Sequence, residues 1–425
     1  MKPAVSGRCG AAERCIIVRN HASVEHVDWR RLAARNVERL KQAMREDELS
    51  AAVIGSMNNI HWLTGIPMTS DYPYFFSHIA VIALDSEEPL LLSPYVKEFF
   101  PEEREWLREV RELAFTKEIE DPTTLVSWHR EIARALRDLG TAGGDLGTAG
   151  AKADKGRERI GVDPRLSIPL YEGIKNELPE LEFVSISKVL SRARSVKGAE
   201  ELKAIRQSCA AAELGLDAGI RAVKLGASER EIAGATAGAL YSFGASGLGF
   251  MPNIVSGERP GILFSSGKRV RPNECVRVDI SPAWGGYYSC LARTVFTGKP
   301  PPQVVDAYTA LRETHEKALS WIKPGMTNYD LYARTKNELE TLTEGAHTLP
   351  FFLGHGIGVS IIDEPWIFDS SCCEETKLEA GMCFLFEPIV RVRGFGDLAL
   401  TDCAAVTETG VEVLTRSDRR LFLVE

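Results

Sequence analysis

A hairpin pattern in the second half of the chain constrains the fold more than any other feature. The segment Val276–Ile280 alternates between two faces, as an antiparallel strand facing a core does, and Gly285-Gly286 follows it as a turn signal. The pattern predicts that Asp279 and Cys290 lie on paired strands. The rest of the chain must supply the core that this hairpin faces.

The chain has 425 residues, more than a typical single domain, so we expect two domains. Apolar residues at helical spacing begin near Trp29 and lead into a short apolar strand at Ala51–Gly55, which indicates an α/β domain. A long amphipathic helix that begins near Lys197 opens the second domain. We therefore predict an N-terminal extension over 1–28, an α/β domain over 29–190 and a second domain over 191–425.

Charge and composition narrow the class of partner. The formal net charge is -8, with Lys and Arg spread along the chain, which argues against nucleic acid or an anionic membrane and favours a small-molecule substrate. No apolar run reaches the roughly 18 residues that span a bilayer, and the first residues are too polar for a secretory signal, so we expect a cytoplasmic protein. The nine cysteines form no C-x-x-C cluster, which predicts reduced thiols.

Three motifs follow in the second domain, at Gly354–Gly358, Asp363–Pro365 and Phe386–Pro388, and Asn59–Gly65 supplies a weaker one in the first. Together with the hairpin, they resemble the creatinase, aminopeptidase P and prolidase family, whose fold is called pita bread. The resemblance implies an α/β (α+β) protein. A creatinase/prolidase-like α/β domain would precede a curved antiparallel sheet flanked by helices, and the protein would be a homodimer.

The family's metallopeptidases hold two metal ions with Asp, Asp, His, Glu and Glu. The resemblance aligns these ligands with Asp279, Cys290, His355, Glu387 and Thr401. A thiol at pH 7 is mostly protonated and a hydroxyl is neutral, so at most two negative charges remain, too few for two cations. We therefore predict no cofactor, while one divalent cation at Asp279, His355 and Glu387 stays open.

The catalytic candidates are Asp279, His355, Asp363 and Glu387. Flanking glycines let a ligand approach His355 closely, and Glu387 follows an apolar run where burial would raise its pKa. Asp363 takes the place of a second family His, and Phe264 stands where peptidase relatives carry a proton-shuttling His.

The substrate-binding candidates are Arg293, Tyr287, Trp366 and Tyr74. An Arg can bind a carboxylate through its bidentate fork, and aromatic rings can wall a small pocket. Two alternatives stay open. Arg293 can instead pair with a buried carboxylate such as Asp279, and the aromatic residues can belong to the core.

The incomplete ligand set makes the chain most similar in character to creatinase or ectoine hydrolase. We predict a metal-independent hydrolase that cleaves a C–N bond in a small amidine, guanidino or cyclic-amidine compound. One alternative is a metal-dependent Xaa-Pro peptidase, or a dimethylsulfoniopropionate-type lyase on the same fold. Another is a non-catalytic pita-bread binding protein.

Overall fold

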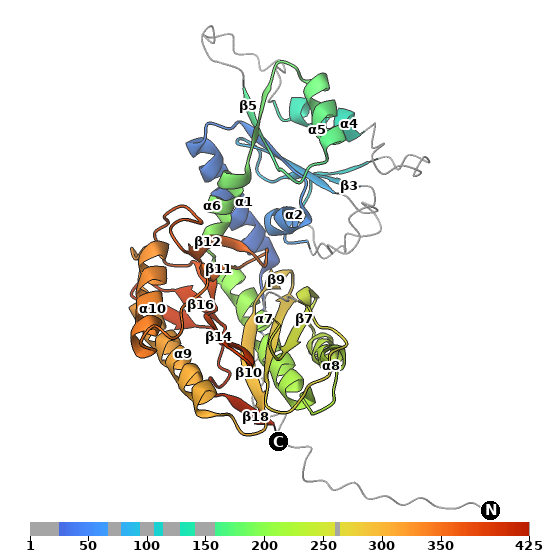
Figure 1. The fold of residues 1–425 in the computed structure, drawn as a ribbon. Coiled ribbons are helices and arrows are strands. Elements are labelled where there is room, and N and C mark those ends of the chain that lie inside the picture. Colours follow the sequence, from blue (N-terminus) through green and yellow to red (C-terminus); the bar gives the residue numbers. More distant parts are fainter. Residues whose placement is uncertain are drawn as a thin grey trace, which may run out of the picture.

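The structure of the protein is a computed structural model that describes residues 25–66, 78–93, 106–113, 128–140, 158–259 and 264–424. Figure 1 shows two bodies, one built from the first part of the chain and the other from the second, with helices α1 and α6 running between them. The predicted fold class is confirmed. The predicted boundary at residue 190 falls inside α6 (Ser187–Ser195).

The N-terminal domain is a mixed six-stranded sheet in the order β4-β3-β2-β1-β5-β6. Its strands are β1 (Ala51–Ile54), β2 (Ile79–Ala83), β3 (Leu90–Ser93), β4 (Val110–Glu112), β5 (Arg159–Val162) and β6 (Glu182–Ser185). Its helices are α1 (Trp29–Glu46), α2 (Met57–Thr64), α4 (Trp128–Asp138) and α5 (Ile168–Glu177).

Strand β1 is buried on both faces, which explains its continuous apolar sequence. Ala52 and Ile54 join a core with α1, whereas Ala51 and Val53 join a second core with α4 and α5. Helix α1 begins at Asp28, whose side chain accepts a hydrogen bond from the backbone N–H of Arg31 and so caps the first turn.

The C-terminal domain consists of two main sheets backed by helices. The first has the strand order β18-β10-β8-β7, with β9 paired to β8, and the second has the order β12-β11-β13-β16-β17. The strands are β7 (Gly247–Ser256), β8 (Cys275–Trp284), β9 (Tyr287–Tyr288), β10 (Leu291–Thr297), β11 (Phe352–Gly356), β12 (Asp363–Phe368), β13 (Cys383–Phe386), β14 (Ile389–Val392), β15 (Gly396–Ala399), β16 (Asp402–Val406), β17 (Val411–Val413) and β18 (Phe422–Val424). The helices are α7 (Ala199–Ala222), α8 (Glu229–Ser242), α9 (Pro302–Trp321) and α10 (Asn328–Leu342).

The predicted hairpin is confirmed, but Cys290 lies in the two-residue link between β9 and β10 and not on a strand paired with Asp279. Strand β8 pairs with β9 across Gly285-Gly286 and then with β10, which places Ala292 opposite Asp279. Both glycines have positive φ, of 52° and 82°, a conformation that glycine adopts without steric cost. Helices α7 and α8 pack against this sheet, and α9 and α10 belong to the core beneath the other one.

The two domains meet through buried polar contacts. Nε2 of His61 on α2 lies 2.7 Å from the carbonyl oxygen of Gly285, and the indole N–H of Trp62 donates to Glu201 on α7.

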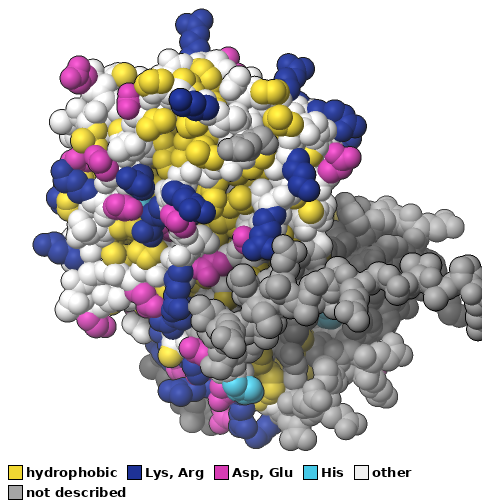
Figure 2. Space-filling model, turned by 90° about the horizontal axis from the view of Figure 1, so that it is seen from below, with side chains coloured by type: hydrophobic (Ala, Val, Ile, Leu, Met, Phe, Trp, Pro, Cys, Tyr) yellow, Lys and Arg dark blue, Asp and Glu magenta, His cyan; other side chains and the backbone are white. Residues whose placement is uncertain are grey.

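Among the described helices, none has the length and apolar character needed to cross a membrane. Figure 2 shows one face of the molecule, where apolar side chains gather centrally and basic and acidic side chains alternate around them. No single sign of charge dominates that face.

Candidate active site

Asp279 lies in the middle of β8, between two neighbouring strands. Asn253 on β7 is its partner on one side and Ala292 on β10 is its partner on the other. Burial raises the pKa of Asp279, although nearby Arg277 and hydrogen bonds from Cys290 and Asn253 oppose this rise. The amide oxygen of Asn253 is buried without a hydrogen-bond partner, so this corner of the site contains an unsatisfied acceptor.

Cys290 occupies the position of the second family Asp, and it acts as a hydrogen-bond donor. Its thiol donates to Oδ1 of Asp279 over 3.3 Å. Burial, followed by the charges of Asp279 and Glu387, holds the pKa of this thiol well above its usual range. A protonated thiol is a poor metal ligand and a poor nucleophile, so Cys290 fixes the orientation of Asp279 instead of replacing the lost carboxylate.

His355 and Glu387 form the opposite side of the site. His355 Nε2 lies 3.7 Å from Glu387 Oε1. Gly354 and Gly356 allow this arrangement, because a Cβ at either position would overlap a backbone carbonyl of a neighbouring strand. His355 is therefore held on a strand inserted tightly between β12 and β13.

The protonation states of this pair follow from burial and hydrogen bonding. Burial lowers the pKa of His355, while burial and the charge of Asp279 raise the pKa of Glu387 to about 8. His355 Nδ1 lies 2.9 Å from the carbonyl oxygen of Gly356, which assigns the ring proton to Nδ1. Nε2 then presents a lone pair towards Glu387, which at pH 7 without a cation is mostly protonated.

The donor set does not fit two metal ions. Thr401, at the position of the last family Glu, is buried beside Ala292 on β10 and brings no charge. Within the described ranges, no three His, Cys, Asp or Glu side chains converge as a ready-made metal site. Asp279, His355 and Glu387 are oxygen and nitrogen donors of the kinds that bind a single divalent cation.

Asp363 is engaged elsewhere and does not face a substrate as a free base. Arg194 on α6 donates to both of its carboxylate oxygens, over 3.0 and 3.2 Å, and also to Asn59 of the N-terminal domain. Asp363 is only 4% exposed. Its position therefore favours a structural ion pair at the domain junction over the predicted catalytic role.

Arg293 takes the structural alternative, although its partner is Asp402 and not Asp279. The guanidinium is fully buried, lies 2.8 Å from Asp402, and donates to the backbone carbonyls of Thr401, Ser417 and Asp418. Because these groups already accept hydrogen bonds from its N–H groups, the guanidinium of Arg293 cannot also bind a substrate carboxylate in a bidentate manner. The predicted contact with substrate is not supported.

The aromatic candidates separate into two groups. Tyr287 is fully buried, donates to Glu201 over 3.2 Å and packs between Trp29 and His61, so it belongs to the domain junction. Trp366 is half-buried, with its ring 6.1 Å from that of His355, as a pocket wall requires. Tyr74 lies outside the described residues.

Sequence reasoning did not identify Asn253 as a site residue. The neighbouring segment is held in place by Ser265, whose hydroxyl accepts from the backbone N–H of Ile254 and donates to the carbonyl of Pro252. Phe264 precedes it and is 65% exposed, so an apolar ring stands where relatives carry a His. An amide opposite a strand Asp would have been the only sequence signal for Asn253.

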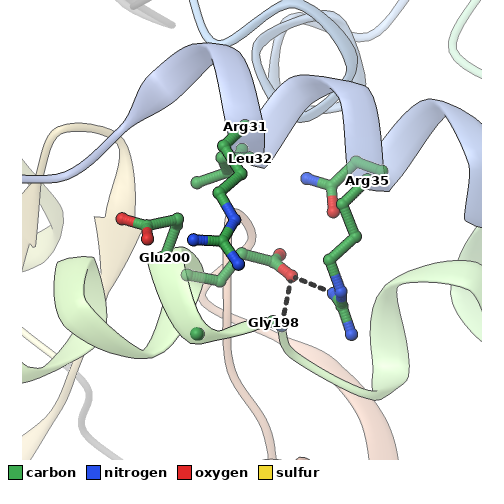
Figure 3. A pocket seen from close by; sticks show the side chains of 8 residues that line it. Arg31, Leu32, Arg35, Gly198 and Glu200 are labelled. Carbon is green, nitrogen blue, oxygen red and sulfur yellow. Dashed lines mark hydrogen bonds and ion pairs between the residues drawn. The ribbon is translucent and has the colours of Figure 1, made fainter.

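A pocket between α1 and α7 lies at the domain junction (Figure 3). Its lining includes Arg31, Arg35 and Glu200, and none of the predicted catalytic residues. Oε2 of Glu201 accepts hydrogen bonds there from Gly198 and Arg35, over 2.8 and 3.3 Å. Because Arg35 pairs with Glu201 and Glu200 pairs with Lys203, we assign this pocket to the junction.

Comparison with known proteins agrees with this geometry. Residues 36–196 match the creatinase/prolidase N-terminal domain, and residues 203–408 match metallopeptidase family M24. The chain belongs to the creatinase, aminopeptidase P and prolidase family. The pita-bread fold inferred from the motifs is therefore confirmed.

Individual members of this family resemble the chain over most of its length. An Xaa-Pro dipeptidase of Lactobacillus helveticus is 26% identical over 92% of this chain and 99% of its own. An Xaa-Pro dipeptidase of Pyrococcus furiosus is 29% identical over 63% of this chain and 76% of its own. The solved Xaa-Pro dipeptidase of Bacillus anthracis superposes with a TM-score of 0.76 at 21% identity, over 92% of this chain and all of that one.

These matches correct the predicted activity. They support the prediction of a hydrolase that cleaves C–N bonds, including peptide bonds. The prediction of a metal-independent, creatinase-like enzyme that acts on a small amidine is wrong. The family relatives are Xaa-Pro dipeptidases, which favours the metal-dependent peptidase alternative. Membership in a metallopeptidase family also implies use of a divalent metal, which conflicts with the prediction of no cofactor.

Proposed function

We propose that this pita-bread protein hydrolyses the C–N bond that precedes proline in a small peptide or amide, using one divalent cation. Relatives named Xaa-Pro dipeptidase that span nearly the whole chain support the reaction class. The observation that carries the proposal is that His355 Nε2 lies 3.7 Å from Glu387 Oε1, which is close enough to Asp279 to be influenced by its charge. The resemblance aligns these three residues with family ligands, and it aligns Cys290 and Thr401 with the two carboxylates that this chain lacks.

Asp279, His355 and Glu387 would hold the cation, which when bound would polarise the scissile carbonyl and lower the pKa of a water molecule. Cys290 and Asn253 orient Asp279 by donating hydrogen bonds to its carboxylate, the thiol of Cys290 to Oδ1. The unsatisfied amide oxygen of Asn253 can accept an N–H group of the substrate.

Proton release should accompany binding of the cation. The pKa of Glu387 is about 8, so at pH 7 most of the protein carries a proton on this carboxyl, next to Nε2 of His355 at 3.7 Å. A cation displaces that proton because it requires the ionised carboxylate. We therefore expect metal affinity to rise with pH up to about pH 8.

Stepwise metal reconstitution tests the proposal. The purified full-length protein would be stripped with a chelator and titrated with Mn²⁺, Co²⁺ or Zn²⁺ while hydrolysis of Leu-Pro is followed. We expect activity to reach its maximum near one metal equivalent and to be lost in Asp279→Asn. The matched control is Glu412→Gln, an exposed carboxylate on β17 paired with Arg206, which should keep full activity. Hydrolysis that survives chelation, or a maximum at two equivalents, would contradict the proposal.

The predicted homodimer, small-molecule substrate and cytoplasmic location belong to the same proposal. The family relationship supports the first two. Light scattering on the purified protein should give twice the mass of one chain, and a mass of 46.8 kDa would contradict the dimer.

A further inference from the structure

A continuous row of aromatic rings leads from His355 to the surface. The ring of Trp366 lies 6.1 Å from His355 and 5.2 Å from Phe368. Phe368 in turn lies 5.8 Å from Phe351 and 6.3 Å from Phe352. We call Trp366, Phe368, Phe351 and Phe352 the aromatic shelf.

The aromatic shelf faces the candidate active site and not the core. Ile367, between Trp366 and Phe368 on β12, is fully buried in the core formed with α9 and α10. Because side chains alternate across a strand, Trp366 and Phe368 point to the opposite face, where both are half-buried. Phe351 is 57% exposed. A contiguous exposed apolar surface that begins at a catalytic candidate is typical of a substrate subsite.

The charges beside the aromatic shelf do not favour a carboxylate. Arg194 already pairs with Asp363, the first residue of β12, so its charge is neutralised there. At the far end, the backbone N–H of Asp369 donates to the carbonyl of Phe351. Hydrogen bonds from Ser371 lower the pKa of Asp369, which is therefore ionised at neutral pH. Lys336 lies near enough to Asp369 to offset its charge, so a substrate group on the shelf would meet apolar ring faces and no net positive charge.

We propose that the aromatic shelf binds an uncharged apolar ring of the substrate, next to the bond that is cut. The preferred substrates are then proline-containing amides or longer peptides whose carboxyl group is blocked, and not dipeptides with a free carboxylate. This inference rests on the proposed hydrolase function. It adds the chemical character of the group that follows the scissile bond.

Three probes separate the effect of charge from the effect of the ring. All three share the leucyl amino group and the proline ring. Leu-Pro ends in a free carboxylate, leucyl-prolinamide ends in an uncharged amide without an aromatic ring, and leucyl-proline anilide adds an aromatic ring. Binding to the full-length protein would be measured by calorimetry, and turnover in parallel. We expect the anilide to bind roughly three- to tenfold more tightly than the amide, as one aromatic contact provides, and Leu-Pro to bind most weakly.

Variants of the shelf complete the experiment. Trp366→Ala should abolish the preference for the anilide, and Trp366→Phe should keep most of it because a ring remains. The matched control is Trp321→Ala on α9, whose ring stacks with Arg334 at 4.4 Å, and it should leave the preference unchanged. A Trp366→Ala protein that folds and keeps the preference, or tighter binding of Leu-Pro than of the anilide, would overturn the inference.

The two proposals fail separately. If none of the probes is hydrolysed under any metal condition, the proposed function fails, but the calorimetric preference for the anilide and its loss in Trp366→Ala still support the aromatic shelf. If the probes are hydrolysed without that preference, the shelf fails and the hydrolase remains.

Discussion

Restoring the two missing carboxylates should convert the site into one that binds two metal ions. The change is Cys290→Asp combined with Thr401→Glu. Because the thiol of Cys290 lies 3.3 Å from Oδ1 of Asp279, a carboxylate in its place would repel Asp279 by about 5 kcal/mol at an effective dielectric constant of about 20. Uptake of a proton limits this cost in the metal-free protein, and two divalent cations remove it.

Metal analysis and thermal unfolding would be measured together. By elemental analysis, the wild-type protein should hold about one metal per subunit and the double variant about two. In chelator, the midpoint of unfolding of the double variant should fall by up to about 10 °C, and it should recover when metal is added. The neutral control Cys290→Ser with Thr401→Gln should show neither the extra metal nor the chelator sensitivity.

One result would refute the reasoning behind this prediction. A folded double variant that binds no more metal than the wild type, and that responds to chelator as the neutral control does, would mean that Cys290 and Thr401 do not stand where ligands of a second cation belong. The assignment of the lost ligands would then be wrong, whatever the activity of the protein.

Three further outcomes test the site and its support. In metal-free protein the pKa of Glu387 is raised from 4.5 to about 8, so the folded state keeps this proton and the free energy of unfolding falls as pH rises across that window. In denaturant titrations at pH 7, Glu387→Gln should therefore remove about 3 kcal/mol of this pH-dependent loss of stability. Curves of stability against pH that run parallel for the variant and the wild type would argue against the raised pKa. Arg194→Ala leaves the charge of Asp363 buried and unpaired, which should cost about 3–5 kcal/mol of unfolding free energy, against little for an exposed arginine. Gly356→Ala places a methyl group against a backbone carbonyl of β12 and should lower the free energy of unfolding by about 1–3 kcal/mol or more. Gly267→Ala, in open space, should leave the melting point unchanged. Equal melting points for the two variants would argue against a close approach between Gly356 and β12.

Features encoded within one element could be predicted from the sequence. The helical spacing of Leu32, Val37, Leu40 and Met44 correctly predicted the buried face of α1. The hairpin around Gly285-Gly286 followed from alternation and turn chemistry alone. Such signals are local, because a helix or a strand buries the face that its own period defines.

Features that depend on distant partners could not be predicted. Arg293 pairs with a residue 109 positions away, Tyr287 with one 86 positions away, and Asp363 with one 169 positions away. A single sequence shows that each group is polar, but not which remote group satisfies it. The activity was mistaken for a different reason. The absence of two family carboxylates, at Cys290 and Thr401, does not remove metal chemistry, because Asp279, His355 and Glu387 suit one cation.

The carboxylate of Glu201 makes the two domains depend on each other for folding. It is 2% exposed and accepts from four donors, the backbone N–H of Gly198 and the side chains of Arg35, Trp62 and Tyr287. The side chains of Arg35 and Trp62 come from the first domain. A fragment that begins at α7 would therefore keep this buried carboxyl group with three of its four donors missing, and the buried phenol of Tyr287 uncovered. We expect that fragment to be insoluble unless the first domain is supplied in trans.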